Sequence, residues 1–179
     1  MKYPFVYQVI GNISIKELSE DIQPAGDKVP IYDEWYLKPF KSSYLDSWLK
    51  QNFYGMELDD DTYFVSQAKY SLFHIDKRHR NYITHRILIP LDTYFQYQWF
   101  VNDTLYSYRP KAGEVLLFNN LVPHRFIMDE DRKDVDRCVV YFNVVDPDAR
   151  AFLHHFEGHH TGYNQEMDKL IKQKLGIDR

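Results

Sequence analysis

Between Thr62 and Val145 the sequence reads as a series of short strands separated by frequent turn signals. Within Ile83–Leu91, apolar residues recur at every second position, which is the period of a strand with one buried face. Asn102-Asp103 separates two apolar runs and predicts a tight hairpin turn. The predicted strands are Tyr63–Phe73, Ile83–Leu91, Tyr94–Val101, Leu105–Tyr108, Glu114–Phe118, Arg125–Met128 and Arg137–Val145. Many short strands of this kind are typical of a β-barrel or a β-sandwich.

Helical signals precede this strand-rich region. Ser14-Ile-Lys-Glu17 has the form of a capping box and predicts a short helix that ends near Ile22. Ser42 or Ser43 can cap a second helix, which Gly55 would end. The apolar face of this second helix comprises Tyr44, Leu45, Trp48 and Leu49. Between the two helices, three residues are expected to interrupt regular structure: Pro24, Gly26 and Pro30.

After Pro147 the sequence again indicates helix, through Leu175, with interruptions at Gly158 and Gly162. The residues expected to be buried there are Phe152, Phe156, Met167, Leu170 and Ile171. We expect a single domain over residues 1–179, because this length is enough for one full hydrophobic core. Its predicted parts are a mixed α/β lead-in (1–62), a β core (63–145) and a C-terminal helical segment (148–175).

Composition narrows the class of protein. Hydrophobic residues make up 44% and charged residues 27% of the chain, as in ordinary soluble proteins. A net charge of −4 argues against a general nucleic-acid binder. The single cysteine, Cys138, excludes an internal disulfide and a multi-cysteine zinc site. Neither a signal peptide nor an apolar run of about 18 residues is present, so a soluble, cytoplasmic protein is expected.

Three residues have the spacing of a metal site. His74 and Asp76 are two apart, and residues two apart on a strand share a face, so both side chains can reach one ion. His124 follows a strand and a turn, which makes it a ligand from a neighbouring strand. Two histidines and one carboxylate form the facial triad of non-haem Fe(II) oxygenases, which leaves open positions on the metal. Each residue taken alone also fits a surface or hydrogen-bonded role.

Two arginines are candidates for binding an anion. Arg137 opens the last predicted strand on a face that suits the interior, where an unpaired charge would be costly. It shares this face with Val139, Tyr141 and Asn143. A guanidinium can grip a carboxylate through two parallel hydrogen bonds, although Asp134 or Asp136 at the strand edge is an alternative partner. Arg86 could be a second anion contact or could face solvent.

Four further residues are candidates for substrate contacts: Arg78, Arg80, Asn120 and Trp99. The two arginines belong to the basic run Lys77–Arg80, which directly follows Asp76. This run could guide an acidic substrate or a nucleic acid, or it could be a solvated loop. Trp99 could line a pocket, but in a chain with 17% aromatic residues core packing explains it equally well.

The order of these signals resembles a known family. After His74-x-Asp76 come the strand Arg86-Ile-Leu-Ile-Pro-Leu91 and the run Gly113-Glu-Val-Leu-Leu-Phe-Asn-Asn120, then His124 and an arginine that opens a final strand. Over these roughly 70 residues, under half of the chain, the sequence resembles the aspartyl/asparaginyl β-hydroxylase branch of the Fe(II)/2-oxoglutarate-dependent oxygenases. The first 60 and last 30 residues show no such resemblance.

The resemblance implies a mainly β fold with flanking helices, built on a double-stranded β-helix (a cupin-like jelly-roll). It implies Fe(II) held by His74, Asp76 and His124, with 2-oxoglutarate on the metal and its distal carboxylate on Arg137. Arg86 matches the family's second anion-contacting arginine. Some members carry a histidine two residues after that arginine, whereas this chain has Leu88, so contacts to the cosubstrate near the iron can differ.

The resemblance further implies hydroxylation of an amino acid or of an Asp, Asn or Pro side chain in a peptide or protein, with decarboxylation of 2-oxoglutarate to succinate. DNA-dealkylating oxygenases match less well, because the segment Arg132–Arg137 lacks their arginine spacing. Two alternatives stay open: a cupin-type metal enzyme that does not use 2-oxoglutarate, and a non-catalytic barrel that binds a partner. The sequence selects neither the substrate nor an oligomeric state.

Overall fold

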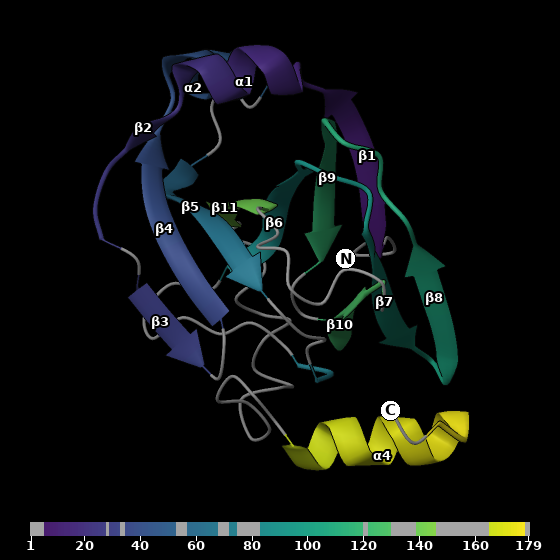
Figure 1. The fold of residues 1–179 in the computed structure, drawn as a ribbon. Helices are drawn as coiled ribbons and strands as arrows, with labels where there is room; N and C mark the ends of the chain where they lie inside the picture. Colours follow the sequence, from purple (N-terminus) through teal and green to yellow (C-terminus); the bar gives the residue numbers. More distant parts are fainter. Residues whose placement is uncertain are drawn as a thin grey trace.

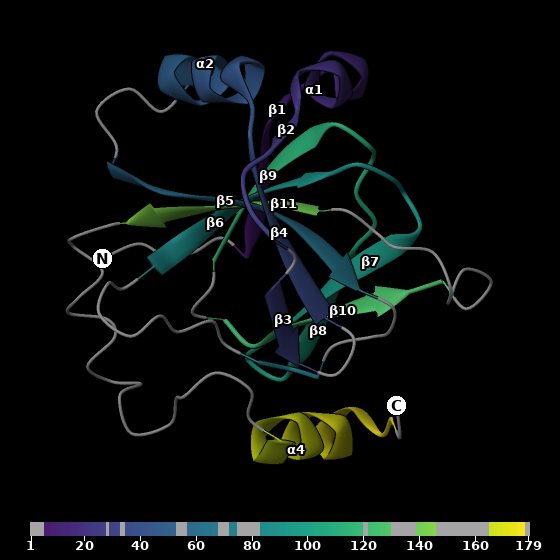
Figure 2. The same cartoon turned by 60° about the vertical axis from the view of Figure 1, so that its left-hand side comes forward.

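The computed structural model describes residues 6–27, 29–32, 35–52, 57–67, 72–74, 83–119, 122–129, 139–145 and 165–177. Over these residues the fold is mainly β, with two antiparallel sheets and helices at opposite ends of the molecule (Figures 1 and 2). Within these ranges no helix has both the length and the apolar character that a membrane-spanning helix requires.

The larger sheet has eight strands among the described residues, in the order β1-β9-β6-β11-β5-β4-β2, with β3 paired to β4. All of the strand pairings in its described part are antiparallel. Its strands are β1 (Tyr7–Asn12), β2 (Gln23–Pro24), β3 (Val29–Tyr32), β4 (Trp35–Lys41), β5 (Glu57–Gln67), β6 (Ile83–Pro90), β9 (Glu114–Asn119) and β11 (Val139–Val145).

The smaller sheet has the order β10-β7-β8 in the described part of the chain. Its strands are β7 (Phe95–Val101), β8 (Thr104–Tyr108) and β10 (His124–Met128). The predicted hairpin turn between β7 and β8 is confirmed, since Asn102 and Asp103 have positive φ angles of 47° and 59° and Val101 pairs with Thr104. The short segment of residues 72–74 lies along the edge of β10 that does not pair with β7, and its His74 forms an isolated antiparallel bridge with His124.

The two sheets face one another, and the alternation of β6 shows which residues lie between them. Leu88 packs with side chains of the smaller sheet, among them Trp99 and Phe126. Its neighbours Ile87 and Ile89 point to the opposite face and pack with the helices at the other side of the larger sheet. The apolar period in Ile83–Leu91 correctly predicted a strand, but the single buried face that it indicated was wrong, since Ile87, Leu88 and Ile89 are all buried because the strand is covered on both faces.

Two helices cover the outer face of the larger sheet: α1 (Ile15–Asp21) and α2 (Ser43–Asn52). Both predicted caps are confirmed. The Ser14 hydroxyl accepts a hydrogen bond from the Glu17 N–H at 3.3 Å, and Ser42, rather than Ser43, accepts one from the Leu45 N–H at 3.0 Å. The apolar face predicted for α2 is also confirmed.

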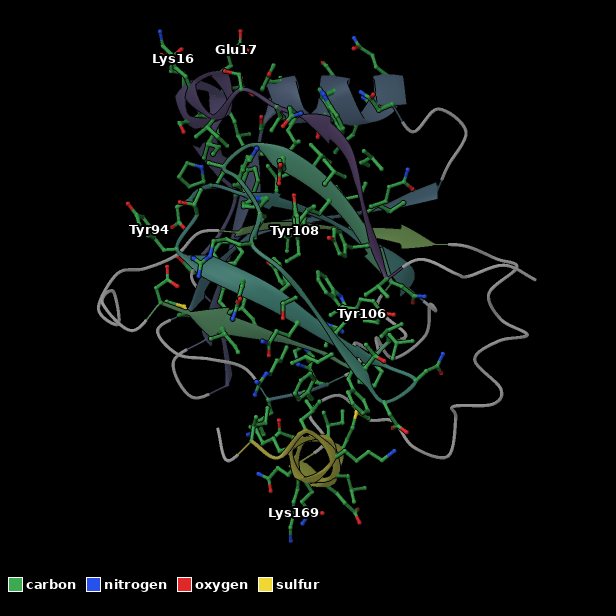
Figure 3. All side chains as sticks on the ribbon, turned by 90° about the vertical axis from the view of Figure 1, so that its right-hand side faces the viewer. Lys16, Glu17, Tyr94, Tyr106, Tyr108 and Lys169 are labelled. Carbon is green, nitrogen blue, oxygen red and sulfur yellow. The ribbon has the colours of Figure 1, made fainter. Side chains whose placement is uncertain are left out.

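Helix α4 (Gln165–Leu175) lies at the opposite end of the molecule, beside the smaller sheet (Figures 1 and 2). The end of the predicted helical segment 148–175 is confirmed by α4, whereas residues 148–164, with Phe152 and Phe156, lie outside the described residues. The burial of Leu170 was predicted wrongly, since its exposed fraction is 55%. Asp168 and Ile171 are buried instead. Position 170 is turned about 200° from position 168 around a helix, so the helix cannot bury both. The side chain of Lys169 also points away from the sheets (Figure 3).

The N-terminal lead-in contains more strand than the sequence indicated. Pro24 and Pro30 were expected to interrupt regular structure, yet they lie in β2 and β3, which both pair with β4. In the described part of the sheet, both strands lie at its edge and pair only with β4. An edge strand tolerates proline, which has no N–H to donate. The strand predicted from Tyr63 begins earlier, at Glu57, because residues 57–59 of β5 pair with the end of β11, while the pairing with β4 covers Tyr63–Gln67.

Candidate metal centre

The two histidines predicted as metal ligands face one another across neighbouring chain segments. His124 begins β10, and His74 forms an antiparallel bridge with it. The His74 N–H donates to the His124 carbonyl at 2.9 Å, and the His124 N–H donates to the His74 carbonyl at 2.9 Å. Directly opposed residues of an antiparallel pair project their side chains to the same face. The predicted encounter of His74 with a histidine from a neighbouring strand is therefore present in the fold.

The separation of the two imidazole rings is compatible with a shared metal ion. Their centroids are 4.5 Å apart and their planes are inclined by 52°. With metal–nitrogen bonds of about 2.1 Å and an angle of about 90° at the metal, two imidazole centres lie roughly 4.5 Å apart. The two histidines consequently fit adjacent positions around a single ion.

Both rings are oriented by the same local hydrogen bond. His74 Nδ1 lies 2.8 Å from the Leu72 carbonyl oxygen, and His124 Nδ1 lies 2.8 Å from the Val122 carbonyl oxygen. Because a carbonyl oxygen only accepts, each Nδ1 carries the proton, and in the neutral ring the lone pair is on Nε2. A metal-binding histidine typically donates its other N–H to such an acceptor, which sets the tautomer and the ring orientation. The donor chemistry of the pair thus fits a transition metal.

Most of the other predicted site residues lie outside the described residues. They are Asp76, Arg78, Arg80, Asn120 and Arg137. Within the described ranges, no group of three or more His, Cys, Asp or Glu side chains is placed to hold a metal. Asp76, two residues after His74 in the sequence, stays a prediction for the third ligand.

Arg86 is described only through its backbone. It lies in β6, where it pairs with Phe118 of β9 and with Asn143 of β11. Its predicted contact with an anion stays a prediction.

Trp99 lies beside the histidine pair in the wall of the barrel. It is the cross-strand partner of His124, and its side chain is fully buried. Its indole stacks on the Tyr7 ring at a centroid distance of 4.8 Å, and Tyr7 stacks in turn on Tyr108 at 4.5 Å. Trp99 is therefore part of the core between the sheets, and its predicted contact with a substrate stays a prediction.

This aromatic stack ends on a carboxylate. The Tyr108 hydroxyl donates to Glu114 Oε2 at 2.7 Å, and burial together with this hydrogen bond raises the pKa of Tyr108 to about 12. Burial and, to a lesser extent, the Glu114 charge also raise the pKa of Tyr7. On the same strand as Tyr108, Tyr106 is exposed (Figure 3). Both phenols of the stack thus stay neutral around neutral pH.

The opposite face of the smaller sheet carries buried polar groups that the sequence did not reveal. Arg125 is only 3% exposed, and its Nε donates to Gln98 Oε1 at 2.8 Å. The Arg125 guanidinium also lies 4.6 Å from the centre of the Phe73 ring, a cation–π arrangement. The Phe73 N–H donates to Asp168 Oδ1 of α4 at 2.8 Å. Phe73 and Arg125, which are adjacent in sequence to the two histidines, are thus fixed by contacts on the face of the smaller sheet opposite the histidine rings.

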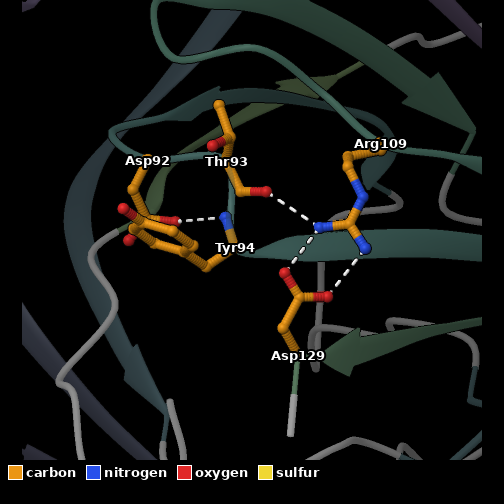
Figure 4. Close-up of polar contacts among 5 residues, drawn as sticks. All are labelled: Asp92, Thr93, Tyr94, Arg109 and Asp129. Carbon is orange, nitrogen blue, oxygen red and sulfur yellow. Dashed lines mark hydrogen bonds and ion pairs between the residues drawn. The ribbon is translucent and has the colours of Figure 1, made fainter. Parts of the chain in front are cut away.

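A second polar cluster closes the other end of the smaller sheet (Figure 4). The Arg109 guanidinium makes two hydrogen bonds of 2.7 Å to the Asp129 carboxylate, and these bonds raise the pKa of Arg109. Arg109 also donates to the Thr93 carbonyl at 3.0 Å, while the Asp92 carboxylate accepts from the Tyr94 N–H at 3.0 Å. This cluster joins the loop before β7 to the ends of β8 and β10, away from the histidine pair.

Comparisons with known proteins identify the fold. No protein-family model and no curated protein sequence matches the chain. Among solved structures, a prolyl hydroxylase from Trichoplax adhaerens, in complex with a hypoxia inducible factor peptide fragment, aligns with a TM-score of 0.57 and 12% identity over 82% of this chain and 86% of that chain. The predicted jelly-roll fold with flanking helices is confirmed.

Other solved structures align less well. A Pseudomonas putida prolyl-4-hydroxylase aligns with a TM-score of 0.46 and 12% identity over 78% of this chain and 90% of that chain. A vicilin from hazelnut (Corylus avellana) aligns with a TM-score of 0.42 and 12% identity over 66% of this chain, which spans only 31% of the vicilin chain. At TM-scores below 0.5, neither adds to the argument. Similarity at 12% identity concerns the fold, and the function has to be argued from the site.

Proposed function

We propose that this protein is an Fe(II)- and 2-oxoglutarate-dependent dioxygenase that hydroxylates an amino acid or a peptidyl side chain. The observation that carries the proposal is the pairing of His74 with His124, whose rings lie 4.5 Å apart with each Nδ1 bound to a carbonyl oxygen. With the carboxylate of Asp76, this pair would complete the facial set of two histidines and one carboxylate. The bound iron would supply the oxidising chemistry, with 2-oxoglutarate converted to succinate and CO₂.

The residues of the chain have distinct roles in this proposal. His74 and His124 bind the metal through Nε2, and the Leu72 and Val122 carbonyls hold the Nδ1 protons in place. The buried aromatic wall around Trp99 restricts water beside the metal, which favours oxidation of the substrate over unproductive reactions. Three protein ligands leave three metal positions for the cosubstrate and O₂.

Arg137 is assigned to the distal carboxylate of 2-oxoglutarate. In the sequence it stands two residues before Val139, the first residue of β11, and residues two apart in an extended chain share a face. Tyr141 of that strand pairs with Leu88, whose side chain packs between the sheets. Arg86, one strand away, is assigned as a second contact for the anion. Two guanidinium groups on one face would neutralise the dicarboxylate.

The proposed substrate is a free amino acid or a peptide with an Asp, Asn or Pro side chain. The Trichoplax adhaerens prolyl hydroxylase, which shares the fold, was solved with a peptide fragment, so peptides belong in the substrate screen. Arg78, Arg80, Asn120 and Trp99 are the proposed substrate-contacting residues. A cupin-type metal enzyme that does not use 2-oxoglutarate would use the same histidines, and a non-catalytic barrel would need no metal.

Anaerobic addition of Fe(II) and 2-oxoglutarate tests the proposal. We expect the weak visible charge-transfer band of a chelated keto acid and, with O₂ and a substrate from an amino-acid and peptide screen, substrate-dependent succinate. Asp76→Ala should remove turnover and most iron affinity and keep the fold. Iron binding without the band or succinate would support the cupin-type enzyme. If the protein bound no iron and 2-oxoglutarate left its thermal stability unchanged, the non-catalytic barrel would be favoured.

A second experiment tests the assignment of the anion-binding arginine. Truncating one partner of a buried charge-assisted pair weakens binding by roughly 2–5 kcal/mol, so Arg137→Ala should weaken 2-oxoglutarate binding about 30-fold or more. Iron binding should be nearly unchanged, and Arg137→Lys should restore only part of the loss. Arg132→Ala, five residues earlier in the sequence, is the matched control and should have little effect. The reverse result would show that the assignment of Arg137 is wrong.

A further inference from the structure

We propose that Asp168, on the C-terminal helix α4, is a positioning residue for the metal centre. It binds the backbone of residues 72–74 and thereby keeps His74 opposite His124. The inference rests on the proposed function only in taking these two histidines as metal ligands. It requires neither 2-oxoglutarate nor a particular substrate.

The first argument comes from the direction of the backbone groups around His74. The N–H and C=O groups of His74 both bond to His124. Consecutive residues of an antiparallel strand direct these groups to alternate sides, so the Phe73 N–H points away from β10. There it donates to Asp168 Oδ1 at 2.8 Å. On this side of the segment, the Asp168 carboxylate accepts the hydrogen bond that a backbone carbonyl of a neighbouring strand would otherwise accept.

The second argument comes from the burial of this carboxylate. Asp168 is only 5% exposed, although charged side chains are rarely buried without partners. Both of its oxygens are bonded, since Oδ2 pairs with Lys172 Nζ at 2.6 Å, one helical turn further along α4. The carboxylate is therefore compensated in place, and it joins two parts of the chain that are 95 residues apart in sequence.

The third argument is that the Phe73 side chain is also held. Its ring lies under the guanidinium of Arg125, which is itself fixed by Gln98, and Gln98 Nε2 donates to Ser107 Oγ at 3.2 Å. Because consecutive side chains of a strand point to opposite faces, a fixed Phe73 directs His74 to the other face, toward His124. The position of His74, a proposed metal ligand, thus depends on contacts that Phe73 makes on the opposite face of the smaller sheet.

Small displacements matter at such a site. Metal-binding groups have to be held within about 0.5 Å of their working geometry, and supporting hydrogen bonds outside the ligands typically change metal affinity 10- to 100-fold. Loss of the Asp168 contact would leave the Phe73 N–H without this acceptor and would permit the His74 segment to shift against β10. Weaker metal binding with a changed coordination geometry is the expected consequence.

The test uses the full chain and the metal alone. Zn(II) affinity is measured by competition with a chelating dye, Co(II) visible absorption reports the coordination geometry, and thermal unfolding without metal reports stability. His124→Ala gives the background from any other metal site. Asp168→Ala should weaken Zn(II) binding about tenfold and change the Co(II) spectrum. Asp168→Asn keeps an oxygen that can accept from Phe73 and should stay within about threefold of wild type.

Two further variants complete the design. Glu166→Ala, at an exposed position of the same helix, should bind Zn(II) as wild type does. Asp168→Glu keeps the charge but moves the carboxylate by one methylene group. It should weaken Zn(II) binding about tenfold and shift the Co(II) spectrum, and it tests the same contact if Asp168→Ala does not fold.

Several results would overturn the inference. Wild-type Zn(II) affinity and Co(II) spectra in Asp168→Ala or Asp168→Glu, with or without a lower unfolding temperature, would show that Asp168 has only a structural role. Equal losses in Asp168→Asn and Asp168→Ala would show that the acceptor oxygen is not what matters. If wild type bound no more metal than His124→Ala, the metal centre itself would be refuted. Normal metal binding with no 2-oxoglutarate chemistry would refute only the proposed function.

Discussion

The helices at the two ends of the molecule bury different kinds of side chain. Helices α1 and α2 pack on the larger sheet through apolar side chains such as Leu18 and Leu45, which meet Ile87 of β6. Helix α4 buries the apolar side chain of Ile171 and, on the same face, the carboxylate of Asp168, which accepts a hydrogen bond from the backbone next to His74. The buried side chains of the first pair are apolar, whereas α4 adds to its apolar burial a directional hydrogen bond to another part of the chain.

This difference fits what each end has to do. Apolar burial is non-directional, so it stabilises the fold without fixing any one atom closely. Hydrogen bonds depend steeply on distance and angle, so they fix the groups that they join. The end with the histidine pair is held by the second kind of contact. We therefore expect substitutions at the α1/α2 end to change stability and substitutions around the histidines to change metal affinity.

The largest effect is expected for His124→Ala. Loss of one of two paired imidazoles should weaken Zn(II) or Co(II) binding at least about 100-fold, because the remaining ligands no longer close the site. The unfolding temperature of the metal-free variant should fall less than that of Leu18→Ala. Calorimetric titration and thermal unfolding check this. Unchanged metal affinity in His124→Ala would remove the functional half of the comparison.

The next effect is expected for Leu18→Ala at the other end. The Leu18 side chain is fully buried between α1 and the larger sheet. Removing a buried leucine side chain typically lowers the free energy of unfolding by about 2–5 kcal/mol. Urea unfolding measures the loss, and Zn(II) affinity below the unfolding transition should equal that of wild type. A clear change in metal affinity would show that the two ends are not independent.

A smaller effect at the same end should depend on pH. Asp21 accepts hydrogen bonds from the Tyr44 N–H at 2.8 Å and the Ser42 hydroxyl at 2.7 Å, which lower its pKa from the usual 3.8. A lowered pKa in the folded state contributes stability above the unfolded pKa and loses it as pH falls through the folded pKa. As the pH falls below about 4, the free energy of unfolding of Asp21→Asn should therefore decrease less than that of wild type. Urea unfolding across this range measures it, and parallel curves for the two proteins would contradict the assignment.

The smallest effect is expected for Lys174→Ala. Lys174 of α4 forms an ion pair with Asp103 in the β7–β8 turn, but both side chains are largely exposed. Exposed pairs of this kind contribute about 0–1 kcal/mol, and salt screens them. Urea unfolding of the variant should be nearly that of wild type, with unchanged Zn(II) affinity. A loss comparable to that of Asp168→Ala would mean that surface charge, rather than the buried contact, attaches α4.

Local sequence patterns were enough for the elements whose contacts are local. The caps at Ser14 and Ser42 bond three residues ahead, and the turn at Asn102-Asp103 depends on two residues that tolerate positive φ. Strands with a clear period of two were found for the same reason. By contrast, β2 and β3 contain prolines and exist through their pairing with β4, which no short stretch of sequence encodes.

By itself, the sequence supplied the candidates for metal ligands, of which His74 and His124 lie in the described part of the chain. Only the tertiary structure decided that these two rings meet at 4.5 Å. Only the tertiary structure decided that Asp168 is buried while Leu170 is exposed. The buried face of α4 includes a hydrogen bond from Asp168 to Phe73, 95 residues away, and such a pairing has no signature in local propensity or period.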